Sequence, residues 1–401
     1  MKIAVLNAWC NGSTGKIISE IAKAGDKQGF KSFLLYGRGS SPFVGNSKNV
    51  NSKINFYADV AVSRLLDNQG RNSICSTSSV IKELEMYSPD ILHLHNLHGY
   101  WLNYPILVKY IIKKDIPVVW TLHDCWAITG HCAYFEYLQC RNRNNGCRDC
   151  PGTSFYPKAL IDRAAKGLIE KKKCFSRLNK AIVVTPSKWL GKLVKNSYLA
   201  KYPTRVINNG ISKDIFHPTD FDYLYQKYNI EKDKRTILYV AMNTNDPWKG
   251  FKYILELRDQ LTEEYQILVV GNCDVESKER FVSIGRTKDQ KELAAFYSMA
   301  DVLINPSLDD NYPTVNLEAL ACGLPIVAFP TGGIPEQVNS DVGYICSEKT
   351  TDALIKGVKY VTQKDRNNIR KKCIDHFNSI NVENIGKQYF GIYKELLGLE
   401  N

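Results

Sequence analysis

The stretch that decides the fold is Leu303-Ile-Asn-Pro-Ser-Leu-Asp-Asp-Asn-Tyr-Pro-Thr-Val-Asn-Leu-Glu-Ala-Leu-Ala-Cys-Gly-Leu-Pro-Ile-Val-Ala-Phe329. An apolar run opens it, a polar loop follows, and Pro313 then stands where the first turn of a helix accommodates proline. Residues Thr314–Ala321 are predicted to form that helix, Gly323 ends it, and Pro325 begins a second apolar run. Strand, loop, helix and strand in this order are typical of a parallel α/β architecture.

The start of this predicted helix favours an anionic ligand. Its free N–H groups and the positive end of its dipole face the loop, which suits a diphosphate. Asp310 lies in that loop and Glu318 lies about one turn inside the helix, where carboxylates can accept hydrogen bonds from vicinal hydroxyls. A routine strand, loop and helix with two solvated acids has the same pattern, so these residues alone leave both interpretations open.

The same alternation extends along the chain, whose 401 residues exceed what one hydrophobic core usually covers. We expect two Rossmann-like parallel-sheet domains facing across a cleft, at residues 1–214 and 215–380, with the polar stretch Asp214–Tyr223 as linker. A C-terminal helix at 381–401 is expected to pack back on the first domain. The predicted elements of the second domain include strands at Thr236–Ala241, Gln266–Gly271, Phe281–Ile284 and Asp301–Asn305, and helices at Phe251–Leu261, Gln290–Met299, Thr314–Ala321 and Thr351–Thr362.

The pair of acids carries a family resemblance. Asp310, seven further residues and Glu318 resemble the acid-x7-Glu signature of the retaining family 4 glycosyltransferases, which have the GT-B fold. The resemblance implies that Asp310 contacts the donor sugar, that Glu318 contacts the nucleotide ribose, and that the N–H groups of Thr314 and Val315 bind the donor phosphates. The family usually has Glu in the first position, so the shorter Asp leaves the donor sugar open. The implied donor set also includes Asn311, Tyr312 and Pro313.

Three other segments resemble the family in the expected order. Asn208–Ser212, followed by Phe216-His-Pro218, is similar to its interdomain segment, and Gly332-Gly-Ile-Pro-Glu336 is similar to its Gly-Gly-x-x-Glu element. A glycine loop after the first predicted strand is similar to the loop that approaches the donor pyrophosphate, although most such loops are only turns. The loop residues are Gly12, Ser13, Thr14 and Gly15.

The basic residues that hold the donor phosphates in the family are only partly present. Lys249 fits the place of the family's Lys, whereas Met242 stands where an Arg is usual. A charge-assisted hydrogen bond of this kind contributes about 1.5–3 kcal/mol. We therefore expect Arg286 or Lys252 to compensate if the contact is kept.

Trp120-Thr-Leu-His-Asp124 ends a predicted strand where family members place a histidine near the reacting sugar. His123, with Lys249 and Asp310, is therefore the expected catalytic set. A lone histidine is more often structural, and the family match reverses that interpretation here. His93 and His95 alternate on one face of another predicted strand. The expected acceptor contacts are His98, Tyr100, Trp101 and Asp124.

Five cysteines lie between Cys125 and Cys150, in an expected insert of the N-terminal domain at about 125–151. Cys-x2-Cys with two more cysteines within 20 residues matches structural zinc chemistry. Reduced thiols or a disulfide pair remain the alternatives. A subset of polysaccharide-assembly glycosyltransferases has a similar insertion. The expected zinc ligands are Cys132, Cys140, Cys147 and Cys150.

The net charge of +12 favours anionic partners such as phosphorylated substrates or an anionic membrane surface. No nucleic-acid module, membrane-spanning run or signal peptide is found in the sequence, so a cytoplasmic protein without a nucleic-acid partner is expected. The aromatic segments Tyr100–Tyr104 and Lys188–Leu190 indicate peripheral contact with the inner face of the cytoplasmic membrane.

The resemblance implies a retaining transferase that moves a sugar from a UDP- or GDP-linked donor to a glycan or polyprenyl-diphosphate-linked acceptor, in capsule, exopolysaccharide or lipopolysaccharide biosynthesis. Front-face attack without a catalytic metal is expected. Two alternatives stay open: a nucleotide-sugar epimerase or hydrolase of the same fold, and a non-catalytic two-lobed sugar-nucleotide-binding protein. The sequence does not identify the sugar, the linkage or the oligomeric state.

Overall fold

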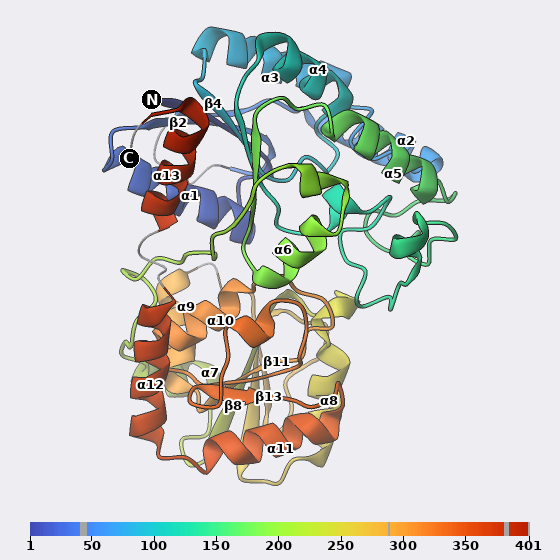
Figure 1. Ribbon diagram of the computed structural model, residues 1–401. Helices are drawn as coiled ribbons and strands as arrows, with labels where there is room; N and C mark the ends of the chain where they lie inside the picture. Colours follow the sequence, from blue (N-terminus) through green and yellow to red (C-terminus); the bar gives the residue numbers. More distant parts are fainter. Residues whose placement is uncertain (41–45, 288, 381–384, 400–401) are drawn as a thin grey trace. The chain divides into compact units, whose positions relative to one another are not determined.

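The computed structural model describes residues 1–40, 46–287, 289–380 and 385–399. The chain divides into two compact units: unit 1 comprises Met1–Asn209 and Asn384–Asn401, and unit 2 comprises Gly210–Glu383. Each unit is a parallel β-sheet covered by helices (Figure 1). The two Rossmann-like sheets that the sequence predicts are therefore confirmed.

Unit 1 has a seven-stranded sheet in the order β3-β2-β1-β4-β5-β6-β7. Its central strands are short runs with every residue buried, as expected for strands covered on both faces. The strands are β1 (Lys2–Trp9), β2 (Lys31–Arg38), β3 (Asn46–Asn49), β4 (Ile91–Leu94), β5 (Val118–Thr121), β6 (Ala181–Thr185) and β7 (Thr204–Val206). The helices are α1 (Gly12–Asp26), α2 (Lys53–Leu66), α3 (Ile74–Tyr87), α4 (Tyr104–Lys114), α5 (Ala164–Phe175), α6 (Lys188–Lys195) and α13 (Ile385–Leu397).

The last helix, α13, packs on unit 1 beside α1 (Figure 1). Tyr389 and Tyr393 of α13 are buried in the same apolar cluster as Ile17 and Ile21 of α1. A Cβ on Gly386 would lie 2.1 Å from the Cβ of Ala24, so the two helices approach closely only because residue 386 is glycine. Residues 381–384, 400 and 401 of the predicted C-terminal helix lie outside the described residues.

Unit 2 has a six-stranded sheet in the order β10-β9-β8-β11-β12-β13. The predicted helices at 290–299, 314–321 and 351–362 are confirmed at both ends. The strands are β8 (Arg235–Asn243), β9 (Tyr265–Asn272), β10 (Phe281–Gly285), β11 (Val302–Asn305), β12 (Ile326–Ala328) and β13 (Gly343–Ile345). The helices are α7 (Asp222–Tyr228), α8 (Phe251–Gln260), α9 (Gln290–Met299), α10 (Thr314–Ala321), α11 (Thr351–Thr362) and α12 (Arg366–Ser379).

The units divide between Asn209 and Gly210, before the stretch Asp214–Tyr223 that the sequence indicates as a linker. Most of that stretch is not an extended connection. Phe216 is buried in the core of unit 2, where its ring lies 6.2 Å from that of Tyr297. Phe216 stands among polar residues in the sequence, so the pattern does not indicate that it belongs to the core. Among the described residues, none of the helices has the length and apolar character to cross a membrane.

Candidate active site

The loop between β11 and α10 is held against a second loop of unit 2 that contains Lys249. The ammonium group of Lys249 lies 2.6 Å from Asp310 Oδ2, and both side chains are partly buried. The backbone N–H of Leu308 donates to the carbonyl of Trp248 at 2.7 Å, which joins the two loops directly. Gly250 has φ +71°, and a Cβ there would meet the β11–α10 loop backbone at 2.1 Å. The structure thus brings together Lys249 and Asp310, two of the residues that the sequence predicts to contact the donor.

The start of α10 fits an anion. Pro313 occupies its N-cap position and offers no side-chain hydrogen bond, so the first turn, with Thr314 and Val315, begins without a side-chain cap. Gly332, from the predicted Gly-Gly-x-x-Glu element, lies against this loop, because a Cβ on it would meet the carbonyl oxygen of Asp310 at 1.7 Å. Asn311 and Tyr312 are buried beside it.

Glu318 lies inside α10 and is only 3% exposed. The hydroxyl of Tyr297, from α9, donates to Glu318 Oε2 at 2.9 Å. Burial and the neighbouring carboxylate raise the pKa of Tyr297 well above its ordinary value, so the phenol stays a donor. Sequence reasoning missed Tyr297, because its place on the apolar face of a predicted helix is typical of a core residue.

A chain of buried amides fixes the orientation of α10. Asn305 Nδ2 donates to Asn316 Oδ1 and Asn316 Nδ2 donates to Gln337 Oε1, each at 2.9 Å. Gln337 Nε2 then donates to the carbonyl of Pro313 at 3.0 Å. All three amide side chains are buried, where hydrogen bonds are strong, so the network holds α10 in one orientation. It keeps the N-terminus of α10 at the carboxyl edge of the sheet.

Met242, at the end of β8, is 45% exposed and replaces the Arg that the resemblance leads us to expect. Lys252, one of the two candidates for compensation, extends over the ring of Tyr253, with Nζ 4.7 Å from its centroid. Arg286 follows β10 and is exposed. Which of the two supplies the contact stays a prediction.

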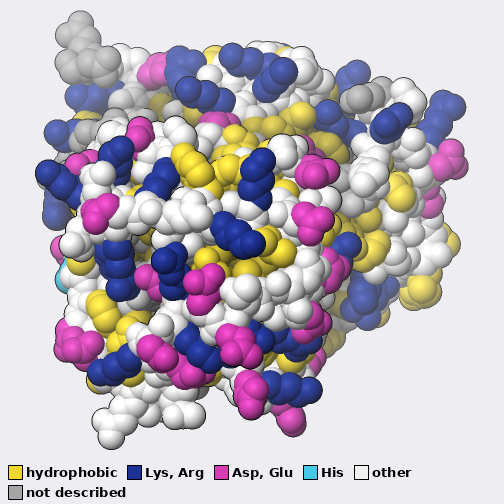
Figure 2. Space-filling view, turned by 90° about the horizontal axis from the view of Figure 1, so that it is seen from below, with side chains coloured by type: hydrophobic (Ala, Val, Ile, Leu, Met, Phe, Trp, Pro, Cys, Tyr) yellow, Lys and Arg dark blue, Asp and Glu magenta, His cyan; other side chains and the backbone are white. Residues whose placement is uncertain are grey.

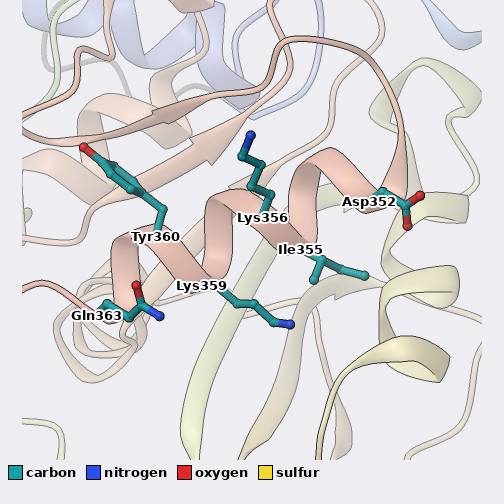
Figure 3. A pocket seen from close by; sticks show the side chains of 6 residues that line it. All are labelled: Asp352, Ile355, Lys356, Lys359, Tyr360 and Gln363. Carbon is teal, nitrogen blue, oxygen red and sulfur yellow. The ribbon is translucent and has the colours of Figure 1, made fainter.

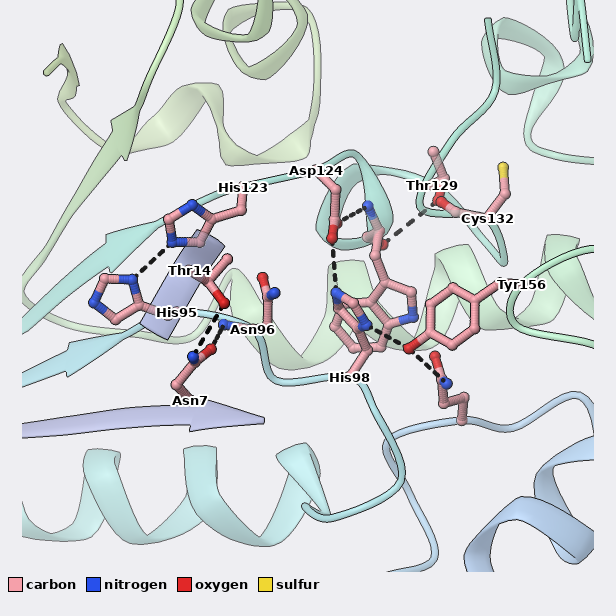
Figure 4. Close-up of polar contacts among 12 residues, drawn as sticks. Asn7, Thr14, His95, Asn96, His98, His123, Asp124, Thr129, Cys132 and Tyr156 are labelled. Carbon is pink, nitrogen blue, oxygen red and sulfur yellow. Dashed lines mark hydrogen bonds and ion pairs between the residues drawn. The ribbon is translucent and has the colours of Figure 1, made fainter. Parts of the chain in front are cut away.

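In unit 1, His123 follows β5 and is hydrogen-bonded to another histidine (Figure 4). His95 Nδ1 lies 2.8 Å from His123 Nε2, and the two rings stack with an interplanar angle of 15°. Burial lowers the pKa of His123 to about 4, so its imidazole is neutral at pH 7. His93 contacts the hydroxyls of Thr121 and Tyr393, each at 2.8 Å. Both histidines are buried; His95 positions His123, whereas His93 is held by Thr121 and by Tyr393 of α13.

His98 and Asp124, both expected at the acceptor side, form a pair (Figure 4). His98 Nε2 lies 2.8 Å from Asp124 Oδ2, and His98 Nδ1 lies 2.8 Å from the hydroxyl of Tyr156. Burial alone raises the pKa of Asp124, but His98 and the N–H of Trp126 outweigh it, so that pKa falls below its ordinary value. Tyr156 is a member of this site that the sequence did not indicate.

The aromatic segment Tyr100–Tyr104 is buried, contrary to its predicted place at a membrane surface. Trp101 and Tyr104 are 0% and 1% exposed, and Trp101 Nε1 donates to the carbonyl of Asn96. Tyr100 is also buried and meets the rings of Phe56 and Tyr156. An apolar ring at the centre of a core gains more from burial than from an exposed position. Trp101 is therefore not carried into the proposal below.

The glycine loop of unit 1 forms the start of α1. Gly15 packs α1 onto β1, because a Cβ there would lie 1.9 Å from the carbonyl oxygen of Cys10. Asn7 Nδ2 donates to Thr14 Oγ1 at 3.3 Å (Figure 4), Gly12 is partly buried and Ser13 is exposed. These residues lie in unit 1, whereas Lys249 and the β11–α10 loop lie in unit 2.

The cysteine-rich insert consists of turns and two short 3₁₀ helices, Trp126–Ile128 and Asn142–Asn145. Cys132 and Cys147 are buried, Cys140 and Cys150 are partly buried, and burial raises the pKa of Cys132 to about 12. The N–H of Gly130 donates to Cys147 Sγ at 3.3 Å. Within the described ranges, no group of three or more His, Cys, Asp and Glu side chains is arranged to hold a metal ion. Structural zinc on these four cysteines therefore stays a prediction from the sequence.

The open hollow along α11 is not part of the candidate site. Its lining residues come from α11 and from Gln363, which directly follows it, and none belongs to the expected donor or acceptor sets (Figure 3). On the face shown in Figure 2, basic and acidic side chains are interspersed, so the net positive charge does not form a continuous basic field there. The lining residues are Asp352, Ile355, Lys356, Lys359, Tyr360 and Gln363.

Known proteins resemble this chain in sequence and in fold. The glycosyl transferase WcaC of Escherichia coli K12, assigned to colanic acid biosynthesis, is 28% identical over 274 residues, which are 67% of this chain and 66% of that protein. Sucrose-phosphate synthase from Thermosynechococcus elongatus superposes with a TM-score of 0.72 at 16% identity, covering 99% of each chain. Anabaena HepE in complex with UDP-glucose gives a TM-score of 0.69 at 14% identity, also covering 99% of each chain. At such identities the two structural similarities establish the fold alone.

Two family models match the chain, one in each half. Residues 220–376 match the model described as Glycosyl transferases group 1, which covers the Lys249–Asp310 pair and Glu318. Residues 14–214, half of the chain, match the model described as Glycosyltransferase Family 4, which covers His123 and the His98–Asp124 pair. This chain is therefore a glycosyltransferase and belongs to family 4.

Proposed function

We propose that this chain transfers a sugar from a UDP- or GDP-linked donor to a sugar hydroxyl of a lipid-linked glycan, with retention of anomeric configuration. The observation that carries the proposal is the arrangement around the start of α10. Lys249 Nζ lies 2.6 Å from Asp310 Oδ2. Glu318 belongs to α10, the helix whose first turn has no side-chain cap, and it accepts a hydrogen bond from Tyr297 of α9. A cation, a helix N-terminus and two carboxylates match a diphosphate, a sugar and a ribose.

In the proposed donor complex, Lys249 and the N–H groups of Thr314 and Val315 neutralise the diphosphate as it leaves. Asp310 accepts hydrogen bonds from the sugar hydroxyls, and Glu318 accepts them from the ribose. Catalysis then rests on positioning and on charge stabilisation, without an enzymic nucleophile. The departing diphosphate takes the proton of the acceptor hydroxyl on the same face of the sugar, which retains the configuration.

On the acceptor side, we propose that His98 and Asp124 bind the acceptor sugar and that neutral His123 faces the donor sugar. The carboxylate of Asp124 is ionised and oriented by His98, so it suits an acceptor hydroxyl as hydrogen-bond partner. The similarity to a glycosyl transferase assigned to colanic acid biosynthesis supports a role in surface polysaccharide assembly. We place the protein in the cytoplasm, at the inner face of the membrane.

The proposal is tested by incubating the purified protein with UDP-, GDP- and dTDP-sugars and a lipid-linked acceptor, followed by NMR of the product. We expect one donor to be consumed only with acceptor present, and the anomeric coupling of the product to match that of the donor. An inverted anomer contradicts the retaining mechanism. Consumption or isomerisation of the donor without any acceptor supports an epimerase or hydrolase instead. Binding without turnover supports a non-catalytic role.

A further inference from the structure

Helix α2 exposes several large apolar side chains to solvent and buries two polar ones. Ile54, Tyr57 and Leu65 are 81%, 67% and 56% exposed, whereas Asp59 and Ser63 are each 2% exposed. From Ile54 to Tyr57 is three positions and from Tyr57 to Leu65 is eight, which places the three side chains on one face of the helix. A surface helix of a globular protein has the opposite arrangement, so this face needs a partner to cover it.

The buried polar side of α2 fixes this orientation. Asp59 Oδ1 accepts hydrogen bonds from Ser63 Oγ at 2.7 Å and from Asn72 Nδ2 at 3.1 Å, and its other oxygen accepts one from Ser73 Oγ. A buried carboxylate is stable only with such partners. Rotating α2 to bury its apolar face would break the hydrogen bonds from Asn72 and Ser73, which lie outside the helix, so these two residues fix which face of α2 is exposed.

The apolar face continues onto the segment that precedes α5. The N–H of Leu160 donates to the carbonyl of Arg64 at 2.7 Å, and Arg163 Nη1 donates to the carbonyl of Leu66 at 3.1 Å. These hydrogen bonds join the segment before α5 to the C-terminal end of α2. Leu160 is 77% exposed and Ile161 is 45% exposed. We call the combined surface the α2 patch, and its members are Ile54, Tyr57, Val62, Leu65, Leu160 and Ile161.

The charges around the α2 patch are basic. Asp59, the acidic residue of α2, is buried. The carboxylate of the exposed Asp162 accepts hydrogen bonds from the backbone N–H groups of Cys150 and Ala164. Four exposed basic side chains outnumber the exposed carboxylate of Asp162, and this favours an anionic partner. A second copy of the same patch would bring two basic rims together and is disfavoured. The exposed basic residues are Lys53, Arg64, Lys158 and Lys166.

We propose that the α2 patch docks unit 1 onto the surface of an anionic phospholipid membrane. An apolar helix face with a basic rim lies in the headgroup region, where apolar side chains enter the lipid and lysines meet phosphates. The proposal rests on the proposed function, because a lipid-linked acceptor is delivered at that surface. It replaces the buried segment Tyr100–Tyr104 as the expected membrane contact.

The test is flotation of the full chain with vesicles of phosphatidylglycerol mixed with phosphatidylcholine, compared with pure phosphatidylcholine. The variant I54S/Y57S/L65S removes three exposed apolar side chains and no hydrogen bond of Asp59, so we expect it to fold. We expect the wild type to float with the anionic vesicles and the variant to lose roughly ten-fold or more of that binding. The matched control M86S/Y223S/L399S removes three exposed apolar side chains elsewhere and is expected to bind like wild type.

Equal flotation of both triple variants and wild type would overturn the proposal, as would equal binding to neutral and anionic vesicles. Sedimentation velocity without vesicles gives a further outcome: a dimer that I54S/Y57S/L65S dissociates would identify a second copy as the occupant instead. Stabilisation of each variant by donor nucleotide is measured in parallel. If membrane binding fails while donor stabilisation persists, the docking surface is wrong and the proposed function stands.

Discussion

Lys249 and Asp310 form an ion pair in which Nζ lies 2.6 Å from Oδ2, and its two members are the expected contacts for the phosphates and for the sugar of one donor. The pair is partly exposed, so its own contribution to stability is small, on the order of 1 kcal/mol or less. The main effect of the ion pair is to orient the two side chains. Before donor binds, each charge holds the other near the uncapped start of α10, which reduces the ordering that binding requires.

Replacing Lys249 by Met is expected to weaken donor binding about 10- to 100-fold, because one charge-assisted hydrogen bond to the diphosphate is lost. Isothermal titration calorimetry with the donor measures this directly. Lys356→Met is the matched control, since Lys356 is an exposed lysine of α11 outside the expected donor set, and Lys252→Met tests the expected compensation. If K252M weakens binding as much as K249M, Lys252 supplies the phosphate contact that Met242 lacks. An unchanged affinity in K249M contradicts the assigned role.

Replacing Tyr297 by Phe is expected to lower the free energy of unfolding by about 1–3 kcal/mol, because buried Glu318 loses a hydrogen-bond donor. Affinity for the nucleotide should fall as well, since the carboxylate is no longer oriented. Urea denaturation and calorimetry measure the two effects. Tyr228→Phe provides the comparison, because Tyr228 donates to Glu292 near the surface and its loss is expected to cost less. Equal effects in both variants contradict an orienting role for Tyr297.

The stability of unit 1 is expected to fall as the pH drops below 6.5. Burial lowers the pKa of His93 to about 3 and that of His123 to about 4. Between pH 6.5 and 4 the unfolded chain therefore binds protons that the folded chain does not, and the free energy of unfolding falls with decreasing pH. Each such histidine contributes about 1.4 kcal/mol per pH unit in that window. The free energy of unfolding, measured by denaturation at a series of pH values, should change less steeply with pH in His123→Gln than in wild type. Equal pH dependence in the two proteins would refute this prediction.

Replacing Tyr393 by Phe is expected to destabilise unit 1 by about 1–3 kcal/mol. The change removes the hydroxyl 2.8 Å from His93 Nδ1 and leaves that nitrogen buried without this partner. Thermal denaturation measures the loss. Phe390→Leu, on the same helix but in a partly buried position, is a control for packing alone. A larger loss in the control than in Y393F would show that α13 acts through apolar contact and not through the histidine network.

The sequence predicted unit 2 well because its signals are local. Thr314–Ala321 follows a proline and precedes a glycine, so both ends of the helix are fixed by neighbouring residues. The contacts that complete the site are not local: Tyr297 reaches Glu318 from another helix, and Gln337 reaches Pro313 across 24 positions. Such partners depend on the packed sheet, and no periodicity in the sequence reports them.

Unit 1 was harder to anticipate. The aromatic residues Tyr100 and Trp101 resemble an interfacial segment in sequence but are core residues, while the exposed apolar face belongs to α2, whose pattern is that of any amphipathic helix. Amphipathicity indicates that one face is apolar, and it does not indicate which face meets the protein. Only the hydrogen bonds of Asp59 settle that question.

The most direct test of the donor site is thermal denaturation of wild type, Glu318→Gln and Glu348→Gln with and without UDP- and GDP-sugars. Glu318 is buried in α10, and Glu348 is an exposed acid of the same unit. We predict that one nucleotide sugar, at a concentration a hundredfold above its dissociation constant, stabilises wild type and E348Q by about 2.7 kcal/mol, and that E318Q loses most of this gain. No stabilisation of wild type by any nucleotide sugar, or equal stabilisation of E318Q, would contradict the donor site proposed for unit 2.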